Sequence, residues 1–136
     1  MNIGLGNRRR TILLIDADAH ARKTLRLALE AAGFSVGEAA SAHEGERALR
    51  IQPDAILAEP LNDPVDHGMT LGAVLRARGS RIPYFLVSTA GEALIGGIGL
   101  HELGIAGVFL KPVEVEIVVQ TLKMRLGMRK ADVADA

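Results

Sequence analysis

The sequence predicts one α/β domain in which a parallel sheet carries helices on both faces. Short apolar runs alternate with longer stretches of helical periodicity along most of the chain, which is the pattern of successive β-α units. The clearest runs are unbroken and end at a carboxylate or a hydroxyl, as strands buried on both faces do. Alternation of this kind favours parallel strands joined by right-handed crossovers.

The composition is that of an ordinary globular domain. The chain has 136 residues, 49% hydrophobic and 24% charged, which is enough for one domain with a sizeable core. Sixteen basic residues balance sixteen acidic ones, so the charge offers no argument for nucleic-acid binding. The absence of cysteine excludes disulfides, thiolate chemistry and Cys-ligated zinc. No apolar run approaches the ~20 residues of a membrane span, and we expect a cytoplasmic protein.

Ten elements follow from these patterns. The strands are assigned from apolar runs bounded by Gly, Pro or polar residues, and the helices from apolar residues three and four positions apart. The expected strands cover 11–15, 34–39, 54–58, 82–87 and 106–110. The expected helices cover 19–32, about 42–51, 69–78, 91–103 and 114–127.

Capping residues mark the ends of the first two helices. Asp18 is a good N-cap for the first helix, and Gly33 is a good stop. Ser41 caps the second helix, and Glu44, three residues later, completes a capping box. The second helix ends before Pro53, because the residue preceding a proline disfavours helical geometry. The strand between these helices is weak and is placed nearer a sheet edge.

The later elements carry weaker signals. Pro83 is tolerable because it stands near the start of its strand. Gly96, Gly97 and Gly99 lie inside the helix at 91–103, each costing about 1 kcal/mol relative to alanine, so we expect it to be frayed or mobile. The domain should span 11–127, between a flexible basic arm at 1–10 and a disordered tail at 128–136. The third helix should present three inward residues: Leu71, Val74 and Leu75.

Polar side chains stand where the expected strands end. The carboxyl ends of parallel strands lie together, and ligand sites of open α/β sheets form there. Acids, hydroxyls and a lysine should therefore meet around one crevice, although strand ends also become polar simply by reaching solvent. These residues are Asp16, Asp18, Glu59, Ser88, Thr89 and Lys111.

The chain resembles a known family at four stretches: Ile12–Asp16, Pro53–Glu59, Leu86–Ala90 and Gly107–Pro112. Their order and spacing resemble the receiver domain of two-component signalling, which histidine kinases phosphorylate on an aspartate. The resemblance covers residues 11 to about 127. It implies a flavodoxin-like fold with strand order 2-1-3-4-5, and a response-regulator module rather than an enzyme.

The resemblance also implies roles for single residues. In the family, an acid pair after the first strand holds a divalent metal, and Asp16 matches its first member. Glu59 matches the phosphoacceptor aspartate. Ser88 and Lys111 match the hydroxyl and lysine that bind the phosphoryl oxygens, and Phe109 matches the aromatic that reports the state. The bond between Lys111 and the proline after it is expected to be cis.

Three departures from the family pattern stand out. Ala17 occupies the second acid position, and Asp18 replaces it only if the loop bends. Glu59 stands where the family has aspartate. Pro64 and Gly68 each lie one residue later than the usual Pro and Gly, which indicates a one-residue insertion in the loop.

These departures disfavour phosphorylation. Phosphoryl transfer needs in-line geometry and Mg²⁺, yet glutamate moves the carboxylate by ~1.5 Å, and misplacement of that size costs about a hundredfold in rate. Loss of an acid at position 17 weakens Mg²⁺ binding, so we expect it to be weak or absent. The longer Glu59 side chain reaches toward Lys111 and Ser88 as a constitutive phospho-mimic, or it is an inert partner of Lys111.

The last helix carries two apolar rows. The inward stripe consists of Val115, Val118, Val119, Leu122 and Leu126. A second row of Ile117, Met124 and Met128 is either a contact surface or ordinary surface scatter. In the family, helix 4, strand 5 and helix 5 form the partner or dimer face, so we favour a protein partner such as a histidine kinase, or a second copy of the chain.

Three functions remain in competition. The first is a single-domain atypical receiver, a pseudo-receiver that acts by protein contact without phosphorylation. The alternative is a phosphorelay receiver that uses Glu59, Asp63 or Asp66. The third, an FMN-binding flavodoxin-like domain, is disfavoured because the chain has only four aromatic residues: Phe34, Tyr84, Phe85 and Phe109.

Overall fold

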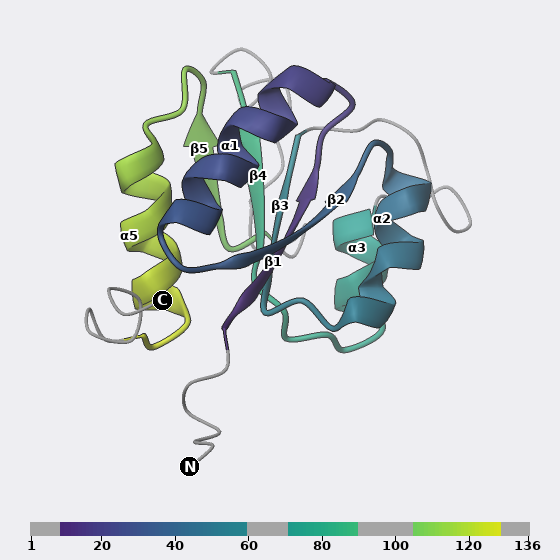
Figure 1. Ribbon diagram of the computed structural model, residues 1–136. Coiled ribbons are helices and arrows are strands. Elements are labelled where there is room, and N and C mark those ends of the chain that lie inside the picture. The colour runs from purple at the N-terminus through teal and green to yellow at the C-terminus, as the bar shows by residue number, and fades with distance from the viewer. Residues whose placement is uncertain (1–8, 60–70, 90–104, 129–136) are drawn as a thin grey trace.

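The five strands form one parallel sheet in the order β2-β1-β3-β4-β5, so the expected flavodoxin-like fold is confirmed (Figure 1). The computed structural model describes residues 9–59, 71–89 and 105–128. The strands are β1 (Thr11–Ile15), β2 (Ser35–Ala39), β3 (Ala55–Ala58), β4 (Tyr84–Ser88) and β5 (Gly107–Leu110). The described helices are α1 (Ala19–Ala31), α2 (Ala42–Ala48), α3 (Leu71–Ala77) and α5 (Val115–Arg125). The helix expected at 91–103 lies outside the described residues, as do Asp63, Asp66 and most of both termini.

The helices cover the sheet from two sides. Helices α1 and α5 lie on one face, and α2 and α3 lie on the other (Figure 1). Each face has its own buried cluster. The α1/α5 side includes Ile12, Leu14, Leu29, Phe34, Leu57, Val118 and Leu122, and the α2/α3 side includes Leu13, Ile15, Ile56, Leu71, Leu75 and Tyr84. Full burial of one such side chain contributes about 1.5–3 kcal/mol, so both faces are needed for the domain to be stable.

Two expected boundaries differ from the structure for local reasons. Strand β4 begins at Tyr84 rather than at 82, because Pro83 has no N–H to give to a sheet; its carbonyl still accepts from the Ile56 N–H at 2.9 Å. The second helix ends as a 3₁₀ turn over Leu49–Ile51. Gln52 then takes a left-handed φ of 56°, which turns the chain into Pro53.

The caps of the first two helices follow the sequence with one shift. The Asp18 side chain accepts from the His20 and Ala21 N–H groups, and Gly33 has a φ of 102°, as expected. The Ser41 hydroxyl accepts from the Glu44 N–H at 3.2 Å. The Glu44 carboxylate, however, accepts from Ala40 at 3.2 Å and not from Ser41, so the capping box is wider by one residue than a standard box.

The inward stripe of α5 is confirmed, and the second apolar row is corrected. Val118, Val119 and Leu122 are buried, and Val115 and Leu126 pack against the same cluster. Ile117 and Met124 are 53% and 80% exposed. Met128, which the sequence placed in the exposed row, is partly buried against the α1/α5 core. The chain turns after α5 at Gly127, where φ is 66°, and this turn brings Met128 back onto the core. No described helix is long and apolar enough to cross a membrane.

We predict that the single tyrosine of the chain ionises at a higher pH than a solvent-exposed tyrosine. Burial raises the pKa of Tyr84 from 10.0 to about 12. The folded state therefore keeps a proton that the unfolded chain releases near pH 10, so stability is fully present below that pH and is lost as the pH rises toward 12. Phenolate absorbance should give a midpoint near 12 in the native chain and near 10 in denaturant. A native midpoint near 10 would show that the ring is solvated.

Candidate functional site

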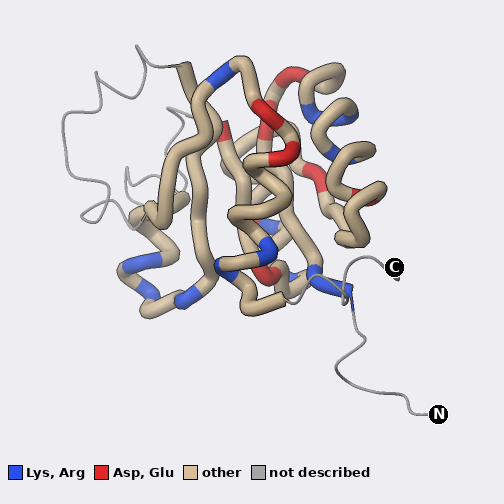
Figure 2. Tube along the Cα trace, turned by 90° about the vertical axis from the view of Figure 1, so that its left-hand side faces the viewer, with Lys and Arg blue, Asp and Glu red and all other residues tan. Residues whose placement is uncertain are grey.

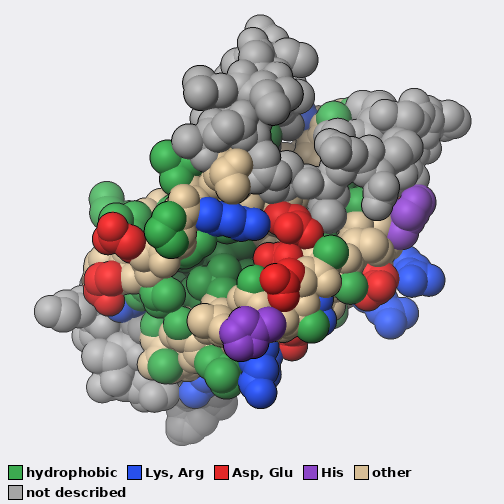
Figure 3. All heavy atoms as spheres, turned by 90° about the horizontal axis from the view of Figure 1, so that it is seen from above, with side chains coloured by type: hydrophobic (Ala, Val, Ile, Leu, Met, Phe, Trp, Pro, Cys, Tyr) green, Lys and Arg blue, Asp and Glu red, His purple; other side chains and the backbone are tan. Residues whose placement is uncertain are grey.

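The predicted polar strand ends do meet at one edge of the sheet. Figure 3 looks onto this edge and shows acidic side chains gathered beside a basic one. The strand register is responsible, since Ile15 pairs with Ala58 and Ser88 with Leu110. The Glu59 N–H donates to the Ile15 carbonyl at 3.0 Å, and the Lys111 N–H donates to the Ser88 carbonyl at 2.9 Å. The sheet therefore sets the positions of these residues directly.

The Glu59 carboxylate is held by donors from two other strand ends. Its Oε1 accepts from the Ala17 backbone N–H at 2.7 Å, and its Oε2 lies 3.9 Å from the Lys111 Nζ. The Glu59 and Lys111 side chains are 20% and 37% exposed, so solvent screens this pair and leaves it worth about 0–1 kcal/mol. The short bond from Ala17 is charge-assisted and contributes about 1.5 kcal/mol or slightly more. Glu59 is thus anchored at the end of β1 and lies within electrostatic reach of Lys111.

The two aspartates after β1 are engaged with the backbone of their own loop. Asp16 Oδ1 accepts from the Asp18 N–H at 2.8 Å. Asp18 Oδ1 accepts from the His20 N–H at 2.9 Å and the Ala21 N–H at 3.2 Å. The hydrogen bond from Ala21, then that from His20, lowers the pKa of Asp18 below its usual value. Asp18 is therefore a charged cap of α1.

Ser88 is the part of the site that differs most from the sequence expectation. Its side chain is fully buried, and its Oγ has no hydrogen-bond partner among the described residues. The expected reach of Glu59 to Ser88 is therefore not present, because both oxygens of Glu59 are directed at Ala17 and Lys111. A buried hydroxyl without a partner costs about 1–3 kcal/mol, so Ser88 destabilises the fold at the carboxyl end of β4.

Phe109 and the Lys111–Pro112 bond lie where the resemblance implies. Phe109 is buried, and its ring stacks on that of Phe85 with centroids 5.3 Å apart. The Lys111–Pro112 peptide bond is cis, as expected. The aromatic ring therefore belongs to the α1/α5 core, two residues before the lysine that faces Glu59.

The structure adds a group of residues that the sequence did not single out. Arg22 donates to the Asp16 carbonyl at 2.6 Å and pairs with Glu38 at 2.9 Å, while Arg26 pairs with the other oxygen of Glu38 at 3.0 Å. These contacts join α1 and β2 to the end of β1, the segment that carries the Ala17 N–H. Sequence periodicity places both arginines off the apolar stripe, and nothing in it links them to a glutamate on the next strand.

The strand order is that of the flavodoxin-like fold, in which polar side chains gather at the carboxyl ends of the strands. The chain is similar to a solved protein described as a response regulator from Chloroflexus aurantiacus, with 29% identity, a TM-score of 0.71 and coverage of 88% of this chain and 99% of that one. It is also similar to a chemotaxis response regulator of Vibrio cholerae (24% identity, TM-score 0.68, coverage 88% and 99%). A receiver domain from Clostridium thermocellum shares the fold at 17% identity, with a TM-score of 0.75 and coverage of 87% and 94%.

These likenesses support a receiver domain of two-component signalling as the class of this chain. The structures below a quarter identity carry the fold alone, and the Chloroflexus aurantiacus protein adds sequence likeness to it. No family model and no curated protein matches the chain. Its own site residues are therefore the basis for the function proposed below.

Proposed function

We propose that this chain is an atypical receiver that acts through protein contact without being phosphorylated. The observation that carries the proposal is the position of the Glu59 carboxylate, which accepts a hydrogen bond from the Ala17 N–H and lies 3.9 Å from the Lys111 ammonium. A receiver that is phosphorylated brings up to about two negative charges to this place, whereas Glu59 supplies one permanently. The module works as a cytoplasmic signalling protein and not as an enzyme.

We also propose that Mg²⁺ binds weakly or not at all. Mg²⁺ prefers near-octahedral oxygen ligands with charged carboxylates among them. One oxygen each of Asp16, Asp18 and Glu59 already accepts a backbone N–H, and position 17 is an alanine. The oxygens that remain do not fit the charged donor set of the family site, so no phosphoryl-transfer step is assigned to a metal here.

Calorimetry with Mg²⁺ tests this part of the proposal. We expect no saturable heat below millimolar Mg²⁺, because Asp16 and Asp18 each accept backbone N–H groups through Oδ1 and position 17 supplies no carboxylate. Asp16→Ala should leave the titration unchanged. Micromolar binding that disappears in Asp16→Ala would show that the acidic site is intact.

The proposed contact surface consists of three exposed apolar side chains on β5 and α5. Leu110, Ile117 and Met124 are 52%, 53% and 80% exposed. Ile117 and Met124 are seven residues apart on α5 and so share one side of the helix. Exposed apolar side chains on neighbouring elements favour a protein partner. We propose that this partner is a signalling protein such as a histidine kinase, or a second copy of the chain.

Incubation with acetyl phosphate and Mg²⁺, followed by intact-mass measurement, tests the proposal as a whole. We expect no phosphoryl adduct, because the acceptor is displaced and the metal ligands are incomplete. Replacement of the four histidines removes adducts on imidazole from the comparison. A stoichiometric gain of one phosphoryl group that survives this replacement would favour the alternative, a phosphorelay receiver that uses Glu59, Asp63 or Asp66.

A further inference from the structure

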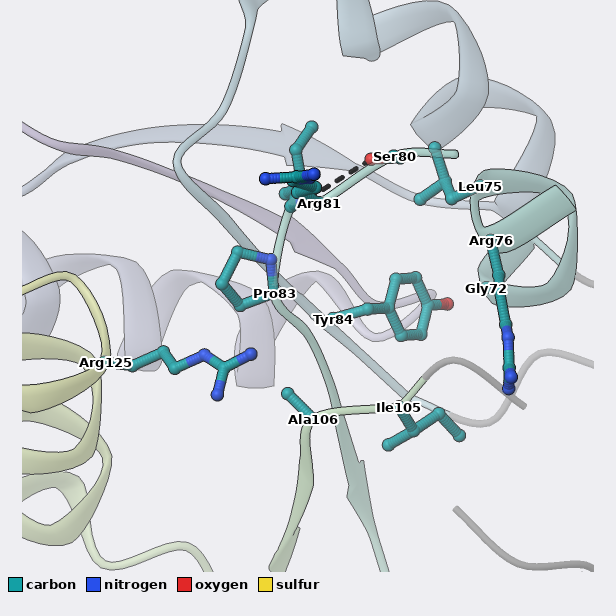
Figure 4. A pocket seen from close by; sticks show the side chains of 11 residues that line it. Gly72, Leu75, Arg76, Ser80, Arg81, Pro83, Tyr84, Ile105, Ala106 and Arg125 are labelled. Carbon is teal, nitrogen blue, oxygen red and sulfur yellow. Dashed lines mark hydrogen bonds between the residues drawn. The ribbon is translucent and has the colours of Figure 1, made fainter. Parts of the chain in front are cut away.

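A cavity lies at the opposite end of the sheet from Glu59. It has a volume of about 520 Å³ and is bordered by the start of β4, the residue before β5, helix α3 and the end of α5. Figure 4 shows Tyr84 at its centre, with Arg125 reaching toward Pro83 and Ala106 from α5. This volume falls within the range of about 300–1,000 Å³ that is typical of small-molecule sites.

The charged side chains that line this cavity are all basic. Three arginines border it, namely Arg76, Arg81 and Arg125, and none of its described lining residues is acidic. Neither Arg81 nor Arg125 makes an ion pair or a hydrogen bond through its side chain within the described part of the chain. In Figure 2 most acidic positions lie toward the Glu59 end of the fold, whereas basic positions occur at both ends, with a group at the opposite end.

Arginine is the side chain best suited to oxyanions. Its planar guanidinium offers a rigid fork that matches carboxylate and phosphate oxygens. Arg81 comes from the loop before β4, and Arg125 from the last turn of α5. Both side chains border the same hollow although their elements are far apart in the sequence, and they lie on opposite sides of Pro83 in Figure 4.

The rest of the lining adds a donor and an apolar wall. Tyr84 directs its hydroxyl toward the Gly72 and Arg76 side of the cavity (Figure 4), and burial raises its pKa to about 12, so the phenol remains a hydrogen-bond donor at neutral pH. The apolar wall is formed by Leu75, Ile82, Pro83 and Ile105. Small-molecule sites combine apolar walls with a few convergent polar groups in this way.

We propose that this cavity binds a small organic anion, with a phosphate or carboxylate group on Arg125, an apolar part against Pro83 and Tyr84, and Arg81 adding positive charge at the rim. The site is separate from the strand-end site, because it lies at the amino ends of β4 and β5. This proposal does not depend on whether Glu59 acts as a phospho-mimic.

Titration of the ¹⁵N-labelled full chain with phenyl phosphate, benzoate and phenol, followed by NMR, tests the proposal. We expect saturable shifts at the Arg81 and Arg125 Nε–H groups and the Ala106 amide with at least one anion, and none with neutral phenol. Tighter binding of phenyl phosphate identifies a phosphate ligand, and tighter binding of benzoate identifies a carboxylate. The double variant Arg81→Gln/Arg125→Gln should bind about tenfold or more weakly, since the charge-assisted bonds are removed.

Arg47→Gln/Arg50→Gln is the matched control, because it removes the same charge from two exposed arginines on and just after α2. It should leave the affinity unchanged. Non-saturating shifts spread over all arginines, or equal affinity in the Arg81/Arg125 variant and the control, would overturn the proposal. Binding of an acidic hexapeptide without binding of either phenyl compound would also overturn it, in favour of a protein segment as the occupant. Thermal unfolding of each variant verifies that the fold is retained.

Discussion

Ala17→Asp combined with Glu59→Asp is expected to convert the chain into a domain that acetyl phosphate labels in the presence of Mg²⁺. Aspartate at 17 supplies the second carboxylate that Mg²⁺ favours. Aspartate at 59 withdraws the acceptor by ~1.5 Å, which also releases it from the 2.7 Å bond with the Ala17 N–H. Because misplacement on this scale costs about a hundredfold, we expect the double variant to be labelled at least a hundredfold faster than the wild type.

The single variants should show that metal and acceptor act as a unit. Ala17→Asp alone leaves the long carboxylate in place, and Glu59→Asp alone lacks a metal ligand. The logarithm of the labelling rate should therefore rise in each single variant by far less than half of its rise in the double variant. Ala17→Asn with Glu59→Asp is the matched control, because it has the shape of the double variant without the added charge. Intact mass against time measures the labelling rate of all five proteins, the wild type included. A double variant that stays unlabelled would place the main defect in the loop that follows Glu59, where the sequence indicates an extra residue.

Much of the fold follows from the sequence because its signals are local. Each buried run, such as 11–15 or 54–58, is apolar, ends at a polar residue and needs no distant information to be recognised as a strand. The errors lie at the ends, where one backbone group decides the outcome. Pro83 cannot donate to a sheet, so β4 starts one residue after it. Glu44 bonds to Ala40 rather than to Ser41, a choice that depends on the approach of the chain to the helix.

The candidate site was only partly predictable because its partners are not all side chains. Parallel strands carry their carboxyl ends to one edge, so the gathering of Asp16, Glu59, Ser88 and Lys111 follows from the strand assignment alone. The partner of Glu59 does not, since its shortest contact is a backbone N–H at the position where the family carries an acid. Neither does the pairing of Arg22 with Glu38, which joins a helix to a neighbouring strand.

Removal of the Glu59 charge is expected to weaken contact through the β5–α5 surface. Glu59→Gln keeps the size of the side chain and an oxygen that accepts from Ala17, so it removes only the attraction for Lys111, which lies 3.9 Å away. Lys111 immediately follows Leu110 of the contact surface and stands two residues after Phe109. A change in the position of Lys111 therefore reaches the contact surface through β5, and the stacked rings of Phe85 and Phe109 couple that strand to β4.

The expected size of this effect is up to about fivefold in the dissociation constant, because the solvent-screened Glu59–Lys111 pair, 3.9 Å apart, is worth about 0–1 kcal/mol. Sedimentation equilibrium of the wild type and Glu59→Gln measures it as self-association, and Met124→Ser should weaken the same equilibrium through the surface itself. Glu46→Gln is the matched control, because it removes a comparable exposed ion pair, Arg78–Glu46 at 3.4 Å, on the α2/α3 side of the sheet. If Glu59→Gln and Glu46→Gln associate as tightly as the wild type while Met124→Ser does not, the surface is real and Glu59 is only a structural partner of Ala17.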